Sequence, residues 1–303
     1  MLSIKQLRYA LAVEKTRHFK KAAEYCSVSQ SALSSAITDL EKQLGAMIFE
    51  RDNKRVLVTE FGKTFLKKAN HINTDINDLY GLAKKTKMAL SEPISIGVIP
   101  TVAPFLFPLV LPLLHEKFPL LKLKLIEGQS EVLVQKVKQG DLDTAILAIP
   151  YPLDHLLAFE FWQEDFYIIM DANHSLAQFS AVSPDKLKPH EILLLDDGHC
   201  LKEHALAACR MTQNITNNLA GTSLITLVAM VAGKMGITLL PKMALPLIKL
   251  HPNLIAIALD EQGPHRKLAS ISRLNYSGLH HLEALNAVFR DALTEESLKE
   301  IVA

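Results

Sequence analysis

With 303 residues, 49% of them hydrophobic and 6% aromatic, the chain is long enough for two or three modest cores and has the composition of a globular protein. Its longest uncharged run, 93–115, carries prolines at 100, 104, 108 and 112, so we expect soluble core there and exclude a membrane span. We recognise no export leader, and only 3 cysteines exclude a disulfide scaffold, which predicts a protein of the reducing cytoplasm.

The formal net charge of +1 conceals a difference between the two ends of the chain. Of the 33 basic and 32 acidic residues, 16 and 9 lie within 1–90, which gives that part a charge of +7. The remaining 17 basic and 23 acidic residues give the rest of the chain a charge of −6. A basic first part indicates contact with a polyanion, and the acidic remainder indicates a different task.

The first 45 residues predict a helix-turn-helix. Apolar spacing predicts helices at 4–14 and 19–25, and Ser29 is a suitable N-cap for a third helix that ends at Gly45. A tight turn at 26–28 joins the second helix to the third, the geometry that places a helix in the DNA major groove. Small polar side chains on the outer face of that third helix can approach bases and phosphates: Ser29, Gln30, Ser31, Ser34, Ser35 and Thr38.

A short hairpin with a basic tip is predicted at 48–59, and it would form the wing of this module. The alternative is a generic three-helix bundle. Residues 60–90 then predict one long helix with an apolar stripe but little core of its own. Such a helix favours dimerisation through the stripe, although packing on its own chain is the alternative. The stripe consists of Leu66, Ala69, Ile72, Ile76, Leu79, Leu82 and Ala83.

Beyond residue 93, strands alternate with helices, which indicates parallel βαβ units. The predicted strands of the first set are 94–99, 121–127 and 144–149, with helices at 104–118 and 131–139. A break at 150–152 precedes a second set, with strands at 166–171, 192–195 and 215–220, and helices around residue 200 and at 224–232. A strand at 268–272 and a helix from His280 are expected to return to the first set, which gives two α/β lobes.

Two of the three cysteines, Cys200 and Cys209, lie on one predicted helix. An intact helix would separate their Cα atoms by about 13 Å, whereas a disulfide needs less than about 7 Å. They are therefore simple buried residues, part of a metal site, or a redox switch that bonds only when the helix reorganises. A metal site would use Cys200 and His204, which share one helix face, with His199 and Cys209 nearby.

Several motifs resemble those of the LysR-type transcriptional regulators, and the similarity runs through the whole chain. They are Ala22-Ala23-Glu24, Val28 to Ser34, Leu40-Glu41, Leu44-Gly45, Phe49-Glu50-Arg51, Thr59 to Gly62, Gly140 to Ile146 and Gly236 to Pro241. The resemblance implies that Gln30 to Thr38 lie on the DNA recognition helix and that Arg51, Lys54 and Arg55 grip backbone phosphate.

The resemblance also implies the division of the chain. A winged helix-turn-helix DNA-binding domain would occupy 1–59 and a linker and dimerisation helix 60–91. A two-lobed α/β regulatory domain of the periplasmic-binding-protein-like type would occupy 92–303. Its lobe I would comprise 92–161 and 267–303, and its lobe II 162–266.

The stretch Gly198-His199-Cys200-Leu201, with Cys209 at this spacing, is similar to the peroxide-sensing members of that family. In those proteins, the cysteine matching Cys200 is oxidised by peroxide to a sulfenic acid, and the one matching Cys209 resolves it to a disulfide. The resemblance favours the redox switch over the other two interpretations, with no bound metal or cofactor. Residues implied in the peroxide pocket are Thr101, Ser130, His199, Glu203 and Arg273, whereas Cys26 is expected to be buried in the DNA-binding module.

The expected function is that of a peroxide-responsive, DNA-binding regulator. The resemblance implies a homodimer or homotetramer on an operator, contact with RNA polymerase, and reduction by a cellular thiol. One alternative is a regulator that senses an organic effector near Thr101 and Thr222. A second is a thiol peroxidase, against which the helix-turn-helix argues.

Overall fold

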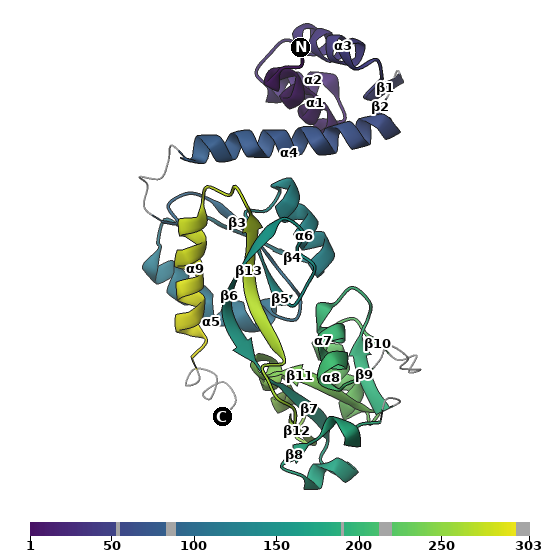
Figure 1. Ribbon diagram of the computed structural model, residues 1–303, viewed down its shortest axis with the longest axis vertical. Helices are drawn as coiled ribbons and strands as arrows, with labels where there is room; N and C mark the ends of the chain where they lie inside the picture. Colours follow the sequence, from purple (N-terminus) through teal and green to yellow (C-terminus); the bar gives the residue numbers. More distant parts are fainter. Residues whose placement is uncertain (53–54, 83–88, 189–190, 212–219, 295–303) are drawn as a thin grey trace. The chain divides into compact units, whose positions relative to one another are not determined.

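The computed structural model describes residues 1–52, 55–82, 89–188, 191–211 and 220–294 (Figure 1). The chain divides into two compact units. The N-terminal unit comprises 1–86 with 138–141, and the C-terminal unit comprises 87–137 with 142–303. Among the described residues, no helix combines the length and hydropathy that a membrane crossing requires.

The N-terminal unit has the predicted winged helix-turn-helix. Its elements are α1 (Ile4–Thr16), α2 (Phe19–Tyr25), α3 (Gln30–Leu44), β1 (Phe49–Asp52), β2 (Arg55–Val58) and α4 (Glu60–Leu82). The expected signals position α3: the Ser29 hydroxyl accepts from the Ala32 N–H at 3.2 Å, and Gly45 ends the helix with φ +66°. Its apolar face, with Leu33 and Ile37 fully buried, joins the core of this unit.

A buried carboxylate fastens the wing to α3. Glu41 is 5% exposed, and its Oε1 accepts from the N–H groups of Ile48 at 2.8 Å and Phe49 at 3.0 Å. These two donors lie where the chain enters β1, in positions from which water is excluded. The acceptor on α3 therefore sets where the wing begins.

We predict that Glu41→Ala destabilises the N-terminal unit by about 2–4 kcal/mol, because two buried N–H groups lose their charged acceptor. Urea unfolding followed by far-UV circular dichroism would measure the loss. Asp39→Ala, at an exposed position of the same helix, is the control and should change stability by less than about 0.5 kcal/mol. Equal effects of the two substitutions would show that the Glu41 hydrogen bonds add nothing.

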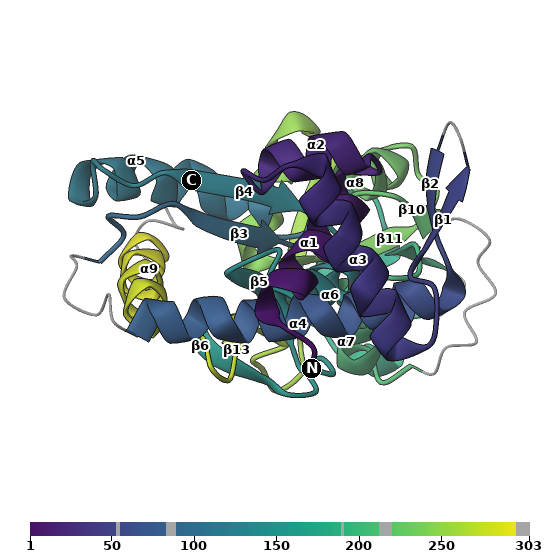
Figure 2. The same ribbon diagram turned by 90° about the horizontal axis from the view of Figure 1, so that it is seen from above.

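The linker helix α4 buries only part of its predicted stripe. Leu66 and Ala69 are 1% exposed, and Leu66 joins the core of the N-terminal unit, where α1 crosses α4 (Figure 2). Ile72 and Leu79, by contrast, are 45% and 65% exposed. The first half of the stripe thus packs on the chain's own module. The exposed second half is consistent with a partner helix, which stays a prediction, and Ala83 lies outside the described residues.

Lobe I of the C-terminal unit is built on a five-stranded sheet of order β4-β3-β5-β13-β6. The strands are β3 (Ile94–Val98), β4 (Leu123–Glu127), β5 (Thr144–Ile149), β6 (Leu156–Glu164) and β13 (Arg266–Arg273), and the helices are α5 (Ala103–Lys117), α6 (Ser130–Gln139) and α9 (Leu279–Ala292). The predicted parallel βαβ units are confirmed, since β3 pairs in parallel with β4 and β5. The returning strand β13 runs antiparallel between β5 and β6, and β6 was not predicted.

Lobe II is built on a six-stranded sheet of order β10-β9-β11-β7-β12-β8 (Figure 1). Its strands are β7 (Phe166–Asp171), β8 (Ala181–Val182), β9 (Ile192–Leu195), β10 (Ala220–Gly221), β11 (Ile237–Pro241) and β12 (Leu254–Leu259). Its α-helices are α7 (Cys200–Ala208) and α8 (Leu224–Ala232), and its 3₁₀ segments are η1 (Ser175–Gln178), η2 (Pro184–Lys186) and η4 (Lys242–Leu250). The strand predicted at 215–220 lies outside the described residues apart from Ala220.

The chain passes between the two sheets twice. The first passage is at Asp165, between β6 and β7, and the second lies between Leu259 of β12 and Arg266 of β13. Both passages fall within a few residues of the lobe boundaries that the sequence predicts. They bring together side chains that are distant in sequence, and this is where the candidate site begins.

Candidate functional site

Cys200 begins α7 and is 4% exposed. The preceding Gly198 has φ +92°, a turn that directs the chain into the helix. Although α7 belongs to lobe II, the Cys200 side chain packs in the hydrophobic core of lobe I. The predicted position of Cys200 at the start of a helix is confirmed.

Cys209 is the C-cap of the same helix, and its N–H donates to the carbonyl of Ala205 at 3.0 Å. It is also 4% exposed, but it packs in the core of lobe II. Burial raises the pKa of its thiol to about 12. The predicted intact helix between the cysteines is confirmed, and at about 1.5 Å per residue it keeps them about 13 Å apart. Both thiols are free.

Arg266, the first residue of β13, contacts Thr101 with its guanidinium group. Arg266 is 1% exposed, and its two terminal nitrogens donate to the Thr101 hydroxyl and carbonyl, each at 3.4 Å. Its Nε donates to Glu164 Oε1 at 2.7 Å, and the other oxygen of that carboxylate accepts from the Met243 N–H at 2.9 Å. This is a fully buried ion pair at the two passages between the lobes.

The structure places Arg273, the cation that the sequence predicts for the pocket, at the opposite end of β13 from Arg266. Arg273 is the last residue of β13 and donates to the carbonyls of Val137 at 3.1 Å and Leu142 at 3.0 Å. At about 3.3 Å per residue, the eight-residue strand separates its two ends by roughly 23 Å. The predicted strand begins at Leu268, whereas β13 begins two residues earlier and includes Arg266.

Ser130 lies at the first residue of α6 and is 1% exposed. Its hydroxyl has no hydrogen-bond partner among the residues that the structure describes. The neighbouring Gln129 donates to the carbonyl of Asp197 at 3.4 Å, and Gly198 lies against the same side chain. The start of α6 therefore touches the loop that leads into Cys200, which brings Ser130 to this region.

His199 and Glu203 flank Cys200 on the outer side. His199 is the N-cap residue of α7 without a side-chain capping bond, and burial lowers its pKa, an effect that Asp196 partly opposes. Glu203 is exposed. Lys202 of the same turn pairs with Asp197 at 2.6 Å, and this hydrogen bond lowers the pKa of the Asp197 carboxyl.

Tyr151 is a neighbour of Cys200 that the sequence did not reveal. It is half-buried, and burial raises the pKa of its phenol, with further contributions from the charges of Glu131, Cys200 and Glu203. These interactions place the segment after β5 next to the start of α7. Tyr151 stands between prolines 150 and 152, and nothing in this local sequence indicated that it would lie near Cys200.

The metal-site interpretation of the cysteines gains no support from the geometry. His204 is 6% exposed, and its Nε2 lies 3.1 Å from the carbonyl oxygen of Pro150. Cys200 and Cys209 pack in separate cores. Within the described ranges, no three side chains of His, Cys, Asp or Glu gather as the ligands of a metal ion would.

The outer face of α3 is the candidate DNA interface. Gln30, Ser31 and Ser35 are exposed. Thr38 instead donates from its hydroxyl to the Ser34 carbonyl at 3.0 Å, within its own helix. Ser29 is exposed but its hydroxyl caps the helix. Arg51 and Arg55 lie on the paired strands β1 and β2, and Lys54 lies outside the described residues.

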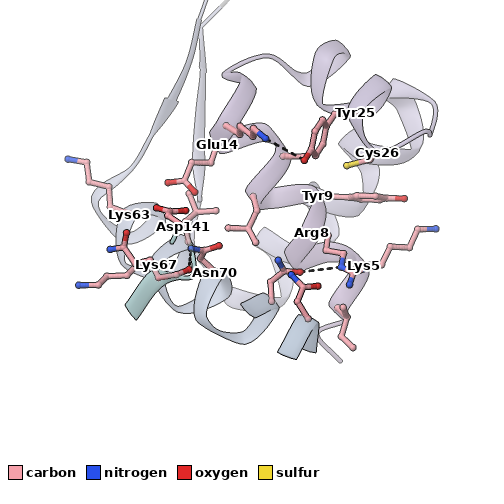
Figure 3. Close-up of a pocket in the computed structure, with 18 of the residues that line it drawn as sticks. Lys5, Arg8, Tyr9, Glu14, Tyr25, Cys26, Lys63, Lys67, Asn70 and Asp141 are labelled. Carbon is pink, nitrogen blue, oxygen red and sulfur yellow. Dashed lines mark hydrogen bonds between the residues drawn. The ribbon is translucent and has the colours of Figure 1, made fainter. Parts of the chain in front are cut away.

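Cys26 lies at the end of α2, apart from the other two cysteines. Figure 3 shows it beside Tyr25 in a groove with Tyr9 and basic residues of α1 and α4. There Lys15 lies 4.7 Å from the centre of the Tyr25 ring. Cys26 is half-buried, and this burial raises the pKa of its thiol. Its position is consistent with a packing role.

Two family descriptions match the chain. The description "Bacterial regulatory helix-turn-helix protein, lysR family" covers residues 4–63, and "LysR substrate binding domain" covers residues 89–296. The chain belongs to the LysR family. The first match covers the helix-turn-helix module, and the second covers the two lobes.

Individual LysR relatives cover nearly the whole chain. The transcriptional regulator EstR of Acinetobacter baylyi is 35% identical over 274 residues, 89% of this chain and 90% of that protein. The hydrogen peroxide-inducible genes activator of Dickeya chrysanthemi is 34% identical over 273 residues, 90% of each chain. The solved structure of a full-length OxyR variant from Pseudomonas aeruginosa has a TM-score of 0.81 and 28% identity, and the match covers 97% of this chain and 96% of that one.

In this LysR regulator, Gly198→Ala should disturb the entry to α7. A Cβ at φ +92° is strained by about 1–2 kcal/mol. It would also lie 2.7 Å from Gln129 Oε1, so that side chain must move. We predict lower stability to urea and an altered rate of Cys200 alkylation.

Gly128→Ala is the matched control for this prediction. Gly128 lies next to Gln129, and a Cβ there would meet only ordinary contacts, 3.4 Å or more from Leu133. Equal behaviour of the two variants would show that the Gly198 turn does not position Cys200.

Proposed function

We propose that the protein is a transcription regulator that hydrogen peroxide switches through a Cys200–Cys209 disulfide. The observation that carries the proposal is the arrangement of two free, buried thiols at opposite ends of α7, each in the core of a different lobe. A bond between them changes the packing of both lobes at once. The similarity to a hydrogen peroxide-inducible activator and to OxyR supports the same conclusion.

The chemistry proceeds in two steps. The Cys200 thiolate attacks one oxygen of peroxide, an S–O bond forms as the O–O bond breaks, and the departing hydroxide takes a proton to become water. The Cys209 sulfur then attacks the Cys200 sulfur, and the S–S bond replaces the S–O bond. The second hydroxide leaves as water with the Cys209 proton. Two thiols are oxidised, one peroxide is reduced, and a cellular thiol reverses the change.

Residues around Cys200 would bind and orient the peroxide. Arg266 replaces Arg273 in the proposed pocket and supplies positive charge near Thr101, whose hydroxyl binds peroxide. The Ser130 hydroxyl, which has no partner in the described part of the chain, is a second hydrogen-bonding group. His199 and Glu203 complete the set beside Cys200, as the resemblance implies.

The switch requires α7 to unwind. Cysteines about 13 Å apart must approach to less than about 7 Å between Cα atoms, so Cys200 must leave the core of lobe I. Such a change would alter how the regulatory domains of a homodimer or homotetramer pack together. The spacing of the DNA-binding modules on the operator and their contact with RNA polymerase would change in turn.

A regulator that senses a small organic effector is the second candidate. It is favoured by the 35% identity to EstR, whose name does not mention peroxide. One experiment separates the two candidates: intact-mass analysis of the reduced protein before and after brief peroxide treatment. The peroxide switch predicts loss of two hydrogen atoms per chain and faster amide exchange within 200–210. An unchanged mass at stoichiometric peroxide would favour the organic effector.

A thiol peroxidase would also form the disulfide, so turnover is the discriminating quantity. The relatives are regulators, and we expect this chain to consume about one peroxide per reduced pair and not to cycle rapidly with dithiothreitol. Many rapid turnovers per chain would support the enzyme.

The DNA-binding function predicts a charge effect at the wing. Arg55→Ala should weaken binding similarly on specific and non-specific duplexes and lower the salt slope by about 1, because one phosphate contact is lost. Gln30→Ala, on the exposed face of α3, should instead change base preference. Fluorescence anisotropy at several salt concentrations measures both effects. A salt slope unaffected by Arg55→Ala would remove this residue from the interface.

A further inference from the structure

His204 makes a contact that the proposed chemistry does not use. Its ring is 6% exposed, and Nε2 lies 3.1 Å from the carbonyl oxygen of Pro150, directly after β5. Because a carbonyl oxygen only accepts hydrogen bonds, Nε2 must carry the proton and donate it. Nδ1 is then the unprotonated nitrogen, and it is buried without a partner among the described residues. This single hydrogen bond therefore fixes the tautomer of the ring.

The position of His204 on α7 links the hydrogen bond to Cys200. It lies one helical turn after Cys200, on the same face of α7. Within the described part of the chain, it is the residue of α7 whose side chain hydrogen-bonds to lobe I. The bond connects residues 54 positions apart in sequence and helps to keep the first turn of α7, with Cys200, on the core of lobe I.

We propose that His204 is a positioning residue of the thiol switch, whose hydrogen bond to Pro150 holds α7 in the reduced arrangement and breaks before Cys200 reaches Cys209. The inference rests on the proposed function, since His204 lies between the two cysteines and moves when the helix unwinds. This hydrogen bond, which we call the His204–Pro150 clasp, stabilises the dithiol form alone. The disulfide is therefore easier to reduce, and a stronger or more concentrated oxidant is needed to form it.

The surroundings of His204 also make the clasp sensitive to acid. Burial lowers the pKa of the ring, the Pro150 hydrogen bond opposes this, the Arg266 charge lowers the pKa further, and Glu203 raises it. A proton on Nδ1 would add a buried donor without an acceptor and a second positive charge near Arg266. Among the described residues, Glu164 pairs with Arg266, Tyr151 follows the Pro150 acceptor, and Cys200 lies one helical turn before His204.

The direction of the pH effect follows from proton binding. In the reduced form His204 stays neutral at a pH where an exposed histidine, with a pKa of about 6.5, becomes charged. Once α7 unwinds, the pKa returns toward that value, so the unwound form binds more protons below about pH 6.5. Acidification through this range therefore favours the unwound, disulfide-forming arrangement. Above about pH 6.5, His204 is neutral in both the reduced and the unwound form, so it no longer makes the equilibrium depend on pH.

The test uses the full-length protein, equilibrated with reduced and oxidised dithiothreitol between pH 5.5 and 8. Alkylation and mass spectrometry measure the fraction with the Cys200–Cys209 disulfide. His204→Leu removes the clasp and should shift the equilibrium about tenfold toward the disulfide, which is about 30 mV for this two-electron couple. His204→Gln keeps an N–H donor but does not titrate. It should match the wild type at pH 8 and lose the extra rise in disulfide below pH 6.5.

Two further measurements distinguish this proposal from the function on which it rests. Amide exchange of 200–208 in the reduced protein should be faster in His204→Leu, and this result does not depend on whether peroxide forms the disulfide. His281→Gln is the matched control, because His281 also hydrogen-bonds to the backbone but lies on α9, where its Nδ1 accepts from the Leu90 N–H at 2.9 Å. It should leave both measurements unchanged.

An unchanged equilibrium and unchanged amide exchange in His204→Leu would overturn the clasp while leaving the peroxide switch in place. If His204→Leu does not fold, a pH profile of His204→Gln identical to that of the wild type would overturn it. A wild-type protein that forms no Cys200–Cys209 disulfide with peroxide would overturn the proposed function, and the redox role of His204 with it.

Discussion

Replacing Cys200 with serine should abolish the response to peroxide, whereas Cys209→Ser should still form a sulfenic acid at Cys200. The reason is the difference between the two environments. Burial raises the pKa of Cys209 to about 12. At pH 7 only about one molecule in 10⁵ then carries a thiolate at that position, and the thiolate is the nucleophile. Cys200 begins a helix next to His199, and the proposed peroxide pocket adds Thr101 and Arg266.

The measurement is labelling with a dimedone-type probe during brief exposure to peroxide, followed by peptide mass spectrometry. We expect label on Cys200 in the Cys209→Ser variant and none on Cys209 in the Cys200→Ser variant. Cys26→Ser is the control for the third thiol and should leave the response unchanged. Label that appears first on Cys209 would reverse the assigned roles.

Removing Arg266 should cause the largest loss of stability in the C-terminal unit. The side chains of Arg266 and Glu164 are both 0% exposed and lie 2.7 Å apart. Arg266→Ala would leave an uncompensated carboxylate in the interior, which costs about 3–5 kcal/mol. Replacing both residues, as Arg266→Met with Glu164→Leu, should recover most of that loss, because no buried charge remains.

Urea unfolding followed by the fluorescence of Trp162 measures this effect, because Trp162 is the single tryptophan of the chain and lies on β6. The neighbouring pair on the same strands, Lys267 and Glu160, is the control. Its side chains are 42% and 51% exposed, so Lys267→Ala should cost no more than about 1 kcal/mol. Similar losses for Arg266→Ala and Lys267→Ala would mean that burial of the ion pair does not govern stability here.

Local signals in the sequence were enough to determine the DNA-binding module. The N-cap at Ser29, the positive-φ glycine at position 45 and the apolar spacing of α3 each act within a few residues, so their consequences can be read without knowledge of distant contacts. The same holds for the α7 helix and for the separation of its two cysteines. The alternation of strands and helices likewise determined the α/β character of the regulatory domain.

Only the tertiary structure decided which side chains surround Cys200. Thr101 and Arg266 are 165 residues apart in sequence, and they meet because β13 returns between β5 and β6. Arg266 and Arg273 stand at opposite ends of β13, and no local signal in the sequence shows which end lies beside Thr101. The sequence did not predict β6 for a related reason: it is the edge strand of its sheet, next to β13, among the residues that the structure describes. His204 shows the same limit: its spacing from Cys200 was visible, but its role depends on the Pro150 carbonyl, which only the packing of the lobes brings to it.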